Sequence, residues 1–254
     1  MNEPRPQRVA LVTGGAVRVG RAISLRLAEA GFDLVVAYRS SAAPAETLSA
    51  ELSAMGRRCE PVHADLADAR AAETVVEAAR DGFGRLDLIV NSASSFEPAR
   101  LLDVDAPAWD TVMAVNARAP HLIVRAAADL LRAARGAVVN IVDLSAFQAW
   151  TAFPHHAVSK AALAHLTRVQ ARALAPEVRV NAVAPGAVLR PKGWSAERWQ
   201  AVARLAPLER AGTPEDVAAA VLYLAEAPFV TGQILSVDGG RSLGRAGAEE
   251  EDRG

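Results

Sequence analysis

The stretch VALVTGGAVRVG, residues 9–20, decides the fold class of this 254-residue chain. A short β-branched apolar run ends in a glycine-rich turn, and a segment of helical period, VGRAISLRLAEAG, follows at once. Glycines in such a turn let the backbone approach a pyrophosphate, and the N-terminus of the next helix supplies unpaired N–H groups and a favourable dipole. The stretch therefore predicts the first strand, turn and helix of a dinucleotide-binding fold.

The same alternation of strand and helix continues along the chain. Helices are expected in the alanine-rich segment to Gly56, over 68–82, across 106–134, after Pro154 and near 213–225. Between them lie the strand-like runs LVVAY (34–38), CEPVHA (59–64), LDLIVN (86–91), AVVNIVD (137–143), VRVNAVA (178–184) and ILSVDGG (234–240). Apolar strands that alternate with helices are typical of a parallel sheet covered on both faces. We therefore expect one α/β domain, residues 8–243, with a Rossmann-type doubly wound sheet.

Two segments fall outside this alternation. The region from Pro185 to Pro207 contains one short helical pattern, SAERWQAVARL, and follows a strand of the sheet. Because open α/β sheets bind ligands beyond the carboxyl ends of their strands, this region is either a lid over the substrate or a passive surface loop. Residues 244–254 lack apolar periodicity and contain an acidic run, which predicts a disordered tail.

Charge and composition exclude several classes of partner. The net charge of −1 offers no electrostatic basis for binding nucleic acid or an anionic membrane surface. No apolar run approaches the roughly 20 residues that a membrane span needs. The single cysteine, Cys59, excludes an internal disulfide and fits a reducing compartment. We expect a cytoplasmic protein that acts on a small molecule without a bound metal.

The end of the second strand decides between the two nicotinamide cofactors. A site for the unphosphorylated ribose needs an acidic residue there, but the sequence reads Tyr38, Arg39, Ser40, and Asp33 lies at the wrong end of the strand. A guanidinium beside a hydroxyl suits a 2′-phosphate, so these residues predict NADPH. The alternative is that Arg39 is an ordinary solvated surface charge.

Several landmarks together resemble the short-chain dehydrogenase/reductase family over residues 8–243. They are TGGAVRVG (13–20), Asp65-Leu66, NSAS (91–94), Asn116, SKAAL (159–163), RVNAVAPG (179–186) and VDGG (237–240). The resemblance implies a homotetramer or homodimer formed through the helices near 106–134 and 154–175. It also implies that the cofactor is bound by Arg39 and Ser40 together with Gly14, Arg18, Val19, Gly20, Asp65, Leu66, Asn91, Ala93, Lys160, Pro185 and Gly186.

Within the family, four details resemble the pteridine reductases. Arg18 stands where the usual turn has a glycine, ASSF (93–96) replaces the commoner alanine-glycine, Asp143 replaces a serine, and the chain continues after the last strand as VDGGRSL. This resemblance implies an NADPH-dependent reductase of dihydropterin or dihydrofolate. The alternatives are a general carbonyl (ketone or 3-oxoacyl) reductase and a catalytically weak NADPH-binding protein. The implied substrate contacts are Arg18, Ser94, Phe96, Asp143 and His156.

The stretch PHHAVSKAAL, Pro154–Leu163, departs from the family pattern. The family places a tyrosine four residues before the catalytic lysine, whereas this chain has His156 before Lys160, and its two tyrosines lie elsewhere. Helical spacing puts His156, and not His155, on the face of Lys160. Three readings stay open: His156 is the general acid, Asp143 or a water donates the proton while His156 shapes the pocket, or the protein binds NADPH with little turnover.

Asn116 completes the expected catalytic set with Asp143, His156 and Lys160. Pro120 lacks the N–H that would bond the carbonyl of residue 116, so a helix through this point must leave that carbonyl free or bend. The family resemblance implies that the free carbonyl of Asn116 holds a water that links solvent to Lys160. The alternative is a proline-induced bend without chemistry.

Overall fold

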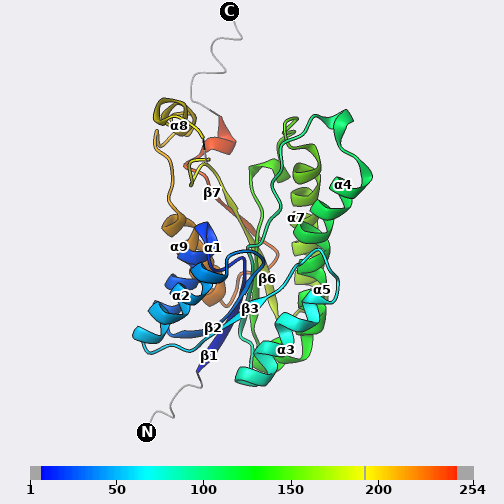
Figure 1. The fold of residues 1–254 in the computed structure, drawn as a ribbon, viewed down its shortest axis with the longest axis vertical. Coiled ribbons are helices and arrows are strands. Elements are labelled where there is room, and N and C mark those ends of the chain that lie inside the picture. The colour runs from blue at the N-terminus through cyan, green and yellow to red at the C-terminus, as the bar shows by residue number, and fades with distance from the viewer. Residues whose placement is uncertain (1–6, 192, 245–254) are drawn as a thin grey trace, which may run out of the picture.

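The computed structural model describes residues 7–191 and 193–244, and within them it confirms the doubly wound α/β fold (Figure 1). The sheet has seven strands in the order β3-β2-β1-β4-β5-β6-β7, and every neighbouring pair is parallel. The strands are β1 (Arg8–Thr13), β2 (Phe32–Tyr38), β3 (Cys59–His63), β4 (Leu88–Asn91), β5 (Ala137–Ile141), β6 (Arg179–Pro185) and β7 (Ile234–Val237). The strand order reverses between β1 and β4, which places the ligand-binding crevice of such folds at the carboxyl ends of these strands.

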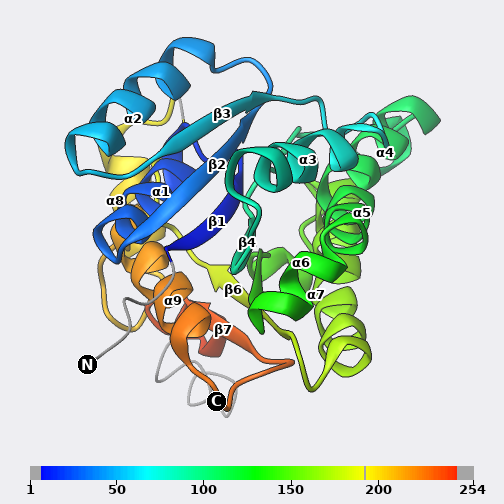
Figure 2. The same ribbon diagram turned by 90° about the horizontal axis from the view of Figure 1, so that it is seen from below.

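Helices cover both faces of the sheet (Figure 2). One face is covered by α1 (Arg18–Glu29), α2 (Ala42–Ala54) and α9 (Pro214–Glu226), and the other by α3 (Ala71–Phe83), α5 (Ala119–Ala126), α6 (Ala128–Ala134) and α7 (Pro154–Leu174). The remaining helices are α4 (Ala106–Met113) and α8 (Ala196–Ala203). The short helix expected between Pro185 and Pro207 is therefore present as α8.

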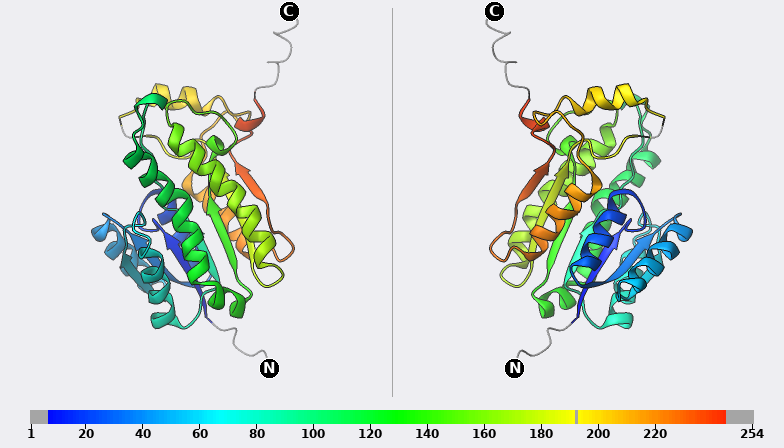
Figure 3. Two further views of the ribbon diagram at one scale, coloured as in Figure 1. Left: turned by 90° about the vertical axis from the view of Figure 1, so that its right-hand side faces the viewer. Right: turned by 90° about the vertical axis from the view of Figure 1, so that its left-hand side faces the viewer.

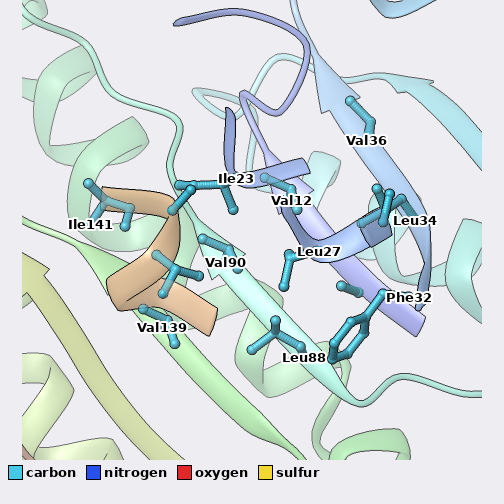
Figure 4. Close-up of a cluster of buried hydrophobic side chains, with 14 of the residues drawn as sticks. Val12, Ile23, Leu27, Phe32, Leu34, Val36, Leu88, Val90, Val139 and Ile141 are labelled. Carbon is cyan, nitrogen blue, oxygen red and sulfur yellow. The ribbon is translucent and has the colours of Figure 1, made fainter. Parts of the chain in front are cut away.

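The core on the α1 face shows why the central strands of the sheet are largely apolar. Ile23 and Leu27 of α1 pack on side chains from several strands, and both are fully buried (Figure 4). The strand residues beneath them are Val12, Leu34, Val36, Leu88, Val90, Val139 and Ile141. Since helices cover the other face of the sheet as well, the central strands β1, β2, β4 and β5 carry apolar side chains on both of their faces.

Three local boundaries differ from the expectation or refine it. The helix expected over 68–82 begins at Ala71, because the Asp68 carboxylate accepts the N–H of Arg70 and holds a turn there. Strand β5 ends at Ile141, so Asp143 lies just beyond the sheet. The helix before Pro120 widens into a π-helical turn, Ala114–Arg118, in which the N–H of Ala119 reaches the carbonyl of Ala114.

Helix α8 and the first turn of α7 lie at the same end of the molecule, beyond the strand carboxyl ends (Figure 3). The Ser195 side chain caps α8 by accepting the N–H of Arg198. None of the helices in the part of the chain that the structure describes combines the length and apolarity needed to cross a membrane. The tail expected at 244–254 lies outside the described residues except for Gly244.

Candidate active site

The turn between β1 and α1 is shaped to receive phosphates. A Cβ on Gly20 would lie 2.1 Å from the carbonyl oxygen of Gly14, and a Cβ on Gly14 would lie 3.0 Å from the Cα of Ala93, so both positions need glycine. The cap residue of α1, Val17, gives no side-chain hydrogen bond, and the first turn holds no acidic residue. The helix N-terminus is therefore left with N–H groups for an external anion, which fits the pyrophosphate of a dinucleotide.

Arg18 opens α1 with a left-handed backbone. Its φ is +54°, a conformation that glycine adopts freely and other residues adopt at a cost of roughly 1–3 kcal/mol. The side chain is exposed beside the phosphate turn. The glycine that is usual here in the family thus has a conformational reason, and the arginine at this position strains the backbone to place a guanidinium at the turn.

Arg18→Gly is expected to raise the free energy of unfolding by up to about 1 kcal/mol, because relief of the left-handed strain exceeds the added entropy of the unfolded chain. The same change is expected to weaken NADPH binding about tenfold through loss of a charge-assisted contact. Thermal unfolding and fluorescence titration measure the two effects. Arg135→Gly is the matched control, since Arg135 has φ +49° at the end of α6 and should gain stability with no change in NADPH affinity. Unchanged NADPH affinity in Arg18→Gly would contradict the assignment.

The residues expected at the adenosine end lie around the carboxyl edge of β2. Arg39 and Ser40 follow β2 and are exposed, and within the described residues the Arg39 guanidinium has no hydrogen bond or ion pair. Asp33 lies at the opposite end of β2 and accepts the backbone N–H of Arg58 at 2.9 Å. Asp65 is exposed, and its carboxylate already accepts the N–H of Ala67 in a turn. The segment that directly follows β2, residues 39–45, therefore presents a cation and contains no carboxylate.

Four other expected cofactor residues lie at or beyond the carboxyl ends of β3, β4 and β6. Asn91 is 2% exposed, and its amide donates to the Asn140 side chain at 2.8 Å, so it ties β4 to β5 and presents no side chain to a ligand. Leu66 is buried in the core on the α3 face. Gly186 follows Pro185 at the end of β6, where a Cβ would lie 2.8 Å from the Cα of Asp238.

The expected catalytic residues meet just beyond β5. His156 Nε2 lies 2.7 Å from Asp143 Oδ2, and the Lys160 ammonium donates to the carbonyl of Ile141 at 2.8 Å. The His156 side chain is 2% exposed and that of Asp143 is 20% exposed. Histidine and lysine thus share one face of α7, as their spacing predicted, and both attach to the segment that ends β5. Of the histidine–aspartate pair, only Asp143 reaches solvent to any extent.

Asn116 holds the other side of the His156 ring. Its side chain accepts the N–H of Ser95 at 2.8 Å and donates to the Ser95 carbonyl at 3.0 Å and to Ser159 Oγ at 2.9 Å. The same Ser95 carbonyl lies 3.0 Å from His156 Nδ1. Each ring nitrogen therefore lies within hydrogen-bond reach of an oxygen atom, and the Asn116 amide nitrogen also lies 3.4 Å from Nδ1. The expected water on the Asn116 carbonyl stays a prediction.

The charges of this cluster are coupled. Burial by itself raises the pKa of the Asp143 carboxyl, but the hydrogen bond from His156, the charges of Lys160 and His156, and Ser145 together hold that pKa below its ordinary value. Burial lowers the pKa of Lys160, and the nearby Asp143 charge opposes this only in part. The cluster therefore holds the ionised carboxylate of Asp143 at neutral pH close to Lys160, whose charge is costly to bury.

Sequence reasoning missed three side chains that support the cluster. Ser145, 3% exposed, donates its hydroxyl and its backbone N–H to Asp143 Oδ1. Ser159 receives the Asn116 amide, and Phe153 stacks on Phe96. Ser145 lies two residues after Asp143 and could have been found as an Asx-turn partner, whereas the other two contacts join segments distant in sequence.

The expected substrate residues Ser94 and Phe96 lie in the loop after β4. Both are exposed, Phe96 by 46%. The Phe96 ring stacks on Phe153 at a centroid distance of 4.2 Å and an angle of 16°, and it meets His156 edge-on at 4.7 Å. One face of the ring expected to stack on a substrate is thus occupied by Phe153.

Comparison with known proteins identifies the protein family to which the chain belongs. The model of the family described as "Enoyl-(Acyl carrier protein) reductase" matches residues 15–242. The chain is 34% identical to a short-chain dehydrogenase/reductase of Cladobotryum sp., covering 94% of this chain and 98% of the relative. It is 32% identical to a 3-oxoacyl-[acyl-carrier-protein] reductase of Synechocystis sp., covering 92% of this chain and 96% of the relative.

A solved structure agrees with these relatives. The crystal structure of a blue fluorescent protein from a metagenomic library, in complex with NADPH, superposes with a TM-score of 0.86 at 35% identity and covers 92% of this chain and 97% of its own. The chain belongs to the short-chain dehydrogenase/reductase family and is an oxidoreductase of that class. Further relatives from Streptomyces violaceoruber and Staphylococcus aureus are likewise named ketoacyl or 3-oxoacyl reductases, which fits the carbonyl alternative better than pteridine reduction.

Proposed function

We propose that this protein is an NADPH-dependent reductase of a carbonyl compound, with a 3-oxoacyl thioester as the first substrate class to test. The observation that carries the proposal is the Asp143–His156 pair at the carboxyl end of β5, with Lys160 one helical turn further on the same face of α7. The relatives named 3-oxoacyl-[acyl-carrier-protein] reductases support a carbonyl as the hydride acceptor.

The cofactor assignment rests on the two ends of the dinucleotide site. The uncapped N-terminus of α1 and the close approach of Gly14 and Gly20 fit a pyrophosphate. At the end of β2, Arg39 and Ser40 fit the 2′-phosphate that distinguishes NADPH from NADH. A similar solved protein was crystallised with NADPH, which supports the same choice.

NADPH is expected to bind more tightly than NADH. Arg39→Ala is expected to reduce the difference between their binding free energies by about 1–3 kcal/mol, the usual contribution of a charge-assisted hydrogen bond. Isothermal titration with both cofactors measures the four dissociation constants. Arg26→Ala is a suitable control, because Arg26 lies in the last turn of α1 and pairs there with Glu29. Equal dissociation constants for the two cofactors in the unaltered protein would refute the assignment.

NADPH, when bound, supplies the hydride that reduces the carbonyl carbon. The chain must then bind the substrate oxygen and deliver one proton to it. Because the His156 ring is buried, we place Asp143 in contact with the substrate and His156 behind it. A protonated His156 would pass its Nε2 proton to Asp143 Oδ2 across the 2.7 Å contact, Asp143 would pass a proton on to the substrate oxygen, and a neutral histidine would remain. The ammonium of Lys160 adds positive charge beside the developing negative oxygen.

A dihydropterin is the second candidate substrate. Its support is the exposed Phe96 ring against His156, the partner of Asp143, since a flat heterocycle could stack on the ring and bond the carboxylate. Arg18 at the phosphate turn is consistent with the same substrate class. A protein that binds NADPH without turnover is the third candidate and is favoured only by the absence of tyrosine at position 156.

Steady-state oxidation of NADPH with acetoacetyl-coenzyme A, simple ketones, dihydropterins and dihydrofolate separates the three candidates. Turnover of the thioester or ketones above the pterins supports the proposal, whereas pterin turnover alone transfers the assignment to pteridine reduction. Tight NADPH binding with no turnover of any substrate would favour the third candidate, a protein that binds NADPH without catalysing its oxidation.

Self-association through the helices near 106–134 and 154–175 stays part of the proposal. Val158 and Val169 on α7 are 46% and 50% exposed, which leaves apolar surface on that helix. Sedimentation equilibrium of the unaltered protein and of Val169→Asp tests whether a dimer or tetramer forms through this face.

A further inference from the structure

Phe153 joins two parts of the site that are far apart in the chain. It is the cap residue of α7, three positions before His156, and its ring stacks on Phe96 from the loop after β4. The centroids are 4.2 Å apart with an angle of 16° between the planes. No sequence pattern marked Phe153, and no step proposed above uses it.

Both rings extend from anchored backbone. Ser95, directly before Phe96, is held through its N–H and its carbonyl by the Asn116 side chain. The same loop is tied to the start of α7 by the N–H of Ala99, which donates to the carbonyl of Ala152 at 3.0 Å. The stacked pair is therefore built between two fixed segments, and Phe96 has little room to leave His156 while Phe153 remains against it.

The rings account for the burial of an otherwise reachable histidine. Asp143 and the Ser95 carbonyl occupy the two nitrogen positions of the His156 ring, and Phe96 meets the ring at 88° with centroids 4.7 Å apart. The histidine side chain is 2% exposed, although Phe96, which lies against it, is 46% exposed and Asp143 beside it is 20% exposed. Phe96 thus stands between His156 and solvent.

We propose that Phe153 is a positioning residue that holds Phe96 across His156, so that His156 communicates with the substrate and with water only through Asp143. A flat substrate that stacks on the face of Phe96 held by Phe153 must displace Phe153, whereas a slender carbonyl compound reaches Asp143 with the aromatic pair intact. Phe153 thereby sets which shapes of substrate the site accepts. This last step rests on the proposed reductase function, but the shielding of His156 does not.

Exchange of the C2 proton of histidine with deuterated solvent, read by mass spectrometry, tests the shielding without any turnover. The protein is used with NADPH bound, and exposed His63 and His121 serve as internal references. We expect His156 to exchange at least fivefold more slowly than the references in the unaltered protein and in Phe153→Tyr, which keeps the stacking ring. In Phe153→Leu, exchange at His156 is expected to rise at least fivefold with the references unchanged.

The kinetic counterpart is a split between substrates. Phe153→Leu is expected to have a lower KM for a bulky planar carbonyl compound and a lower kcat with a small ketone than the unaltered protein. Phe153→Tyr is expected to keep both values of the unaltered protein. Far-ultraviolet circular dichroism and the melting temperature show whether each variant is folded. Phe96→Leu is a second variant that is expected to expose His156.

Exchange at His156 as fast as at His121 in the unaltered protein, or exchange unchanged by Phe153→Leu and Phe96→Leu, would overturn the proposal. Altered exchange without turnover of any substrate would uphold the shielding and refute only the reductase function.

Discussion

His156→Ala is expected to lower kcat for NADPH oxidation by about 10²–10⁴-fold, the usual contribution of a general acid or base. In the proposed mechanism the proton reaches Asp143 from His156 across the 2.7 Å contact, and the alanine variant has no group there to supply it. The NADPH dissociation constant is expected to stay within about twofold, because the phosphate turn and Arg39 are untouched.

His156→Tyr is the matched comparison, since it restores the residue that the family pattern has at this position. A phenol has an unperturbed pKa of about 10 and an imidazole one of about 6.5, so the tyrosine variant is expected to hold its rate to higher pH than the unaltered protein. Rate profiles from pH 5 to pH 10 with the best substrate of the panel measure this. If His156→Ala keeps the rate and profile of the unaltered protein, Asp143 or a water donates the proton without the histidine.

The Asp143–His156 contact also affects the stability of the folded protein toward acid. Because the folded pKa of Asp143 lies below its unfolded value, the ionised carboxylate contributes stability at neutral pH, and this contribution is lost as pH falls through the folded pKa. The loss therefore belongs to the acid range below about pH 4, where a free aspartate titrates. In His156→Ala the acid unfolding transition is expected to begin at higher pH, since the carboxylate loses its hydrogen bond.

Lys160→Met is expected to lower kcat by about 10²–10³-fold, the usual cost of removing one electrostatic partner of a developing negative charge. The same change is expected to raise the free energy of unfolding at neutral pH by about 1 kcal/mol, because methionine fills the space without the cost of burying a charge. Lys160 is 3% exposed and its charge has only a backbone carbonyl as direct hydrogen-bond partner among the described residues.

The stability gained by Lys160→Met is expected to depend on pH. Since burial lowers the folded pKa of Lys160, the unfolded chain binds more protons between the folded and unfolded pKa values, and the stability of the unaltered protein rises with pH through that window. The advantage of Lys160→Met is therefore expected to shrink as pH approaches about 10.4, the value of a free lysine. Chemical denaturation at pH 7 and pH 10 measures it, and a variant with full turnover or with lower stability at pH 7 would contradict the assignment.

The order of strands and helices was predictable from the sequence, because it depends on local rules. Apolar runs of five to seven residues between helical patterns fit a sheet buried on both faces, and the glycines at 14 and 20 fit positions where a Cβ would collide with backbone. The four-residue spacing of His156 and Lys160 likewise predicted their shared helix face, since 3.6 residues complete a turn. These features follow from residues that are close along the chain.

Only the tertiary structure decided which of the site residues reach solvent. The sequence offered His156 as a candidate acid, but the fold buries its ring behind Asp143 and Phe96, and it turns Asn91 into a link between β4 and β5. Burial and side-chain pairing depend on segments such as the loop after β4 and the start of α7, which lie about sixty residues apart and meet only when the sheet is assembled. No local pattern records such contacts, because they are fixed by packing across the whole domain.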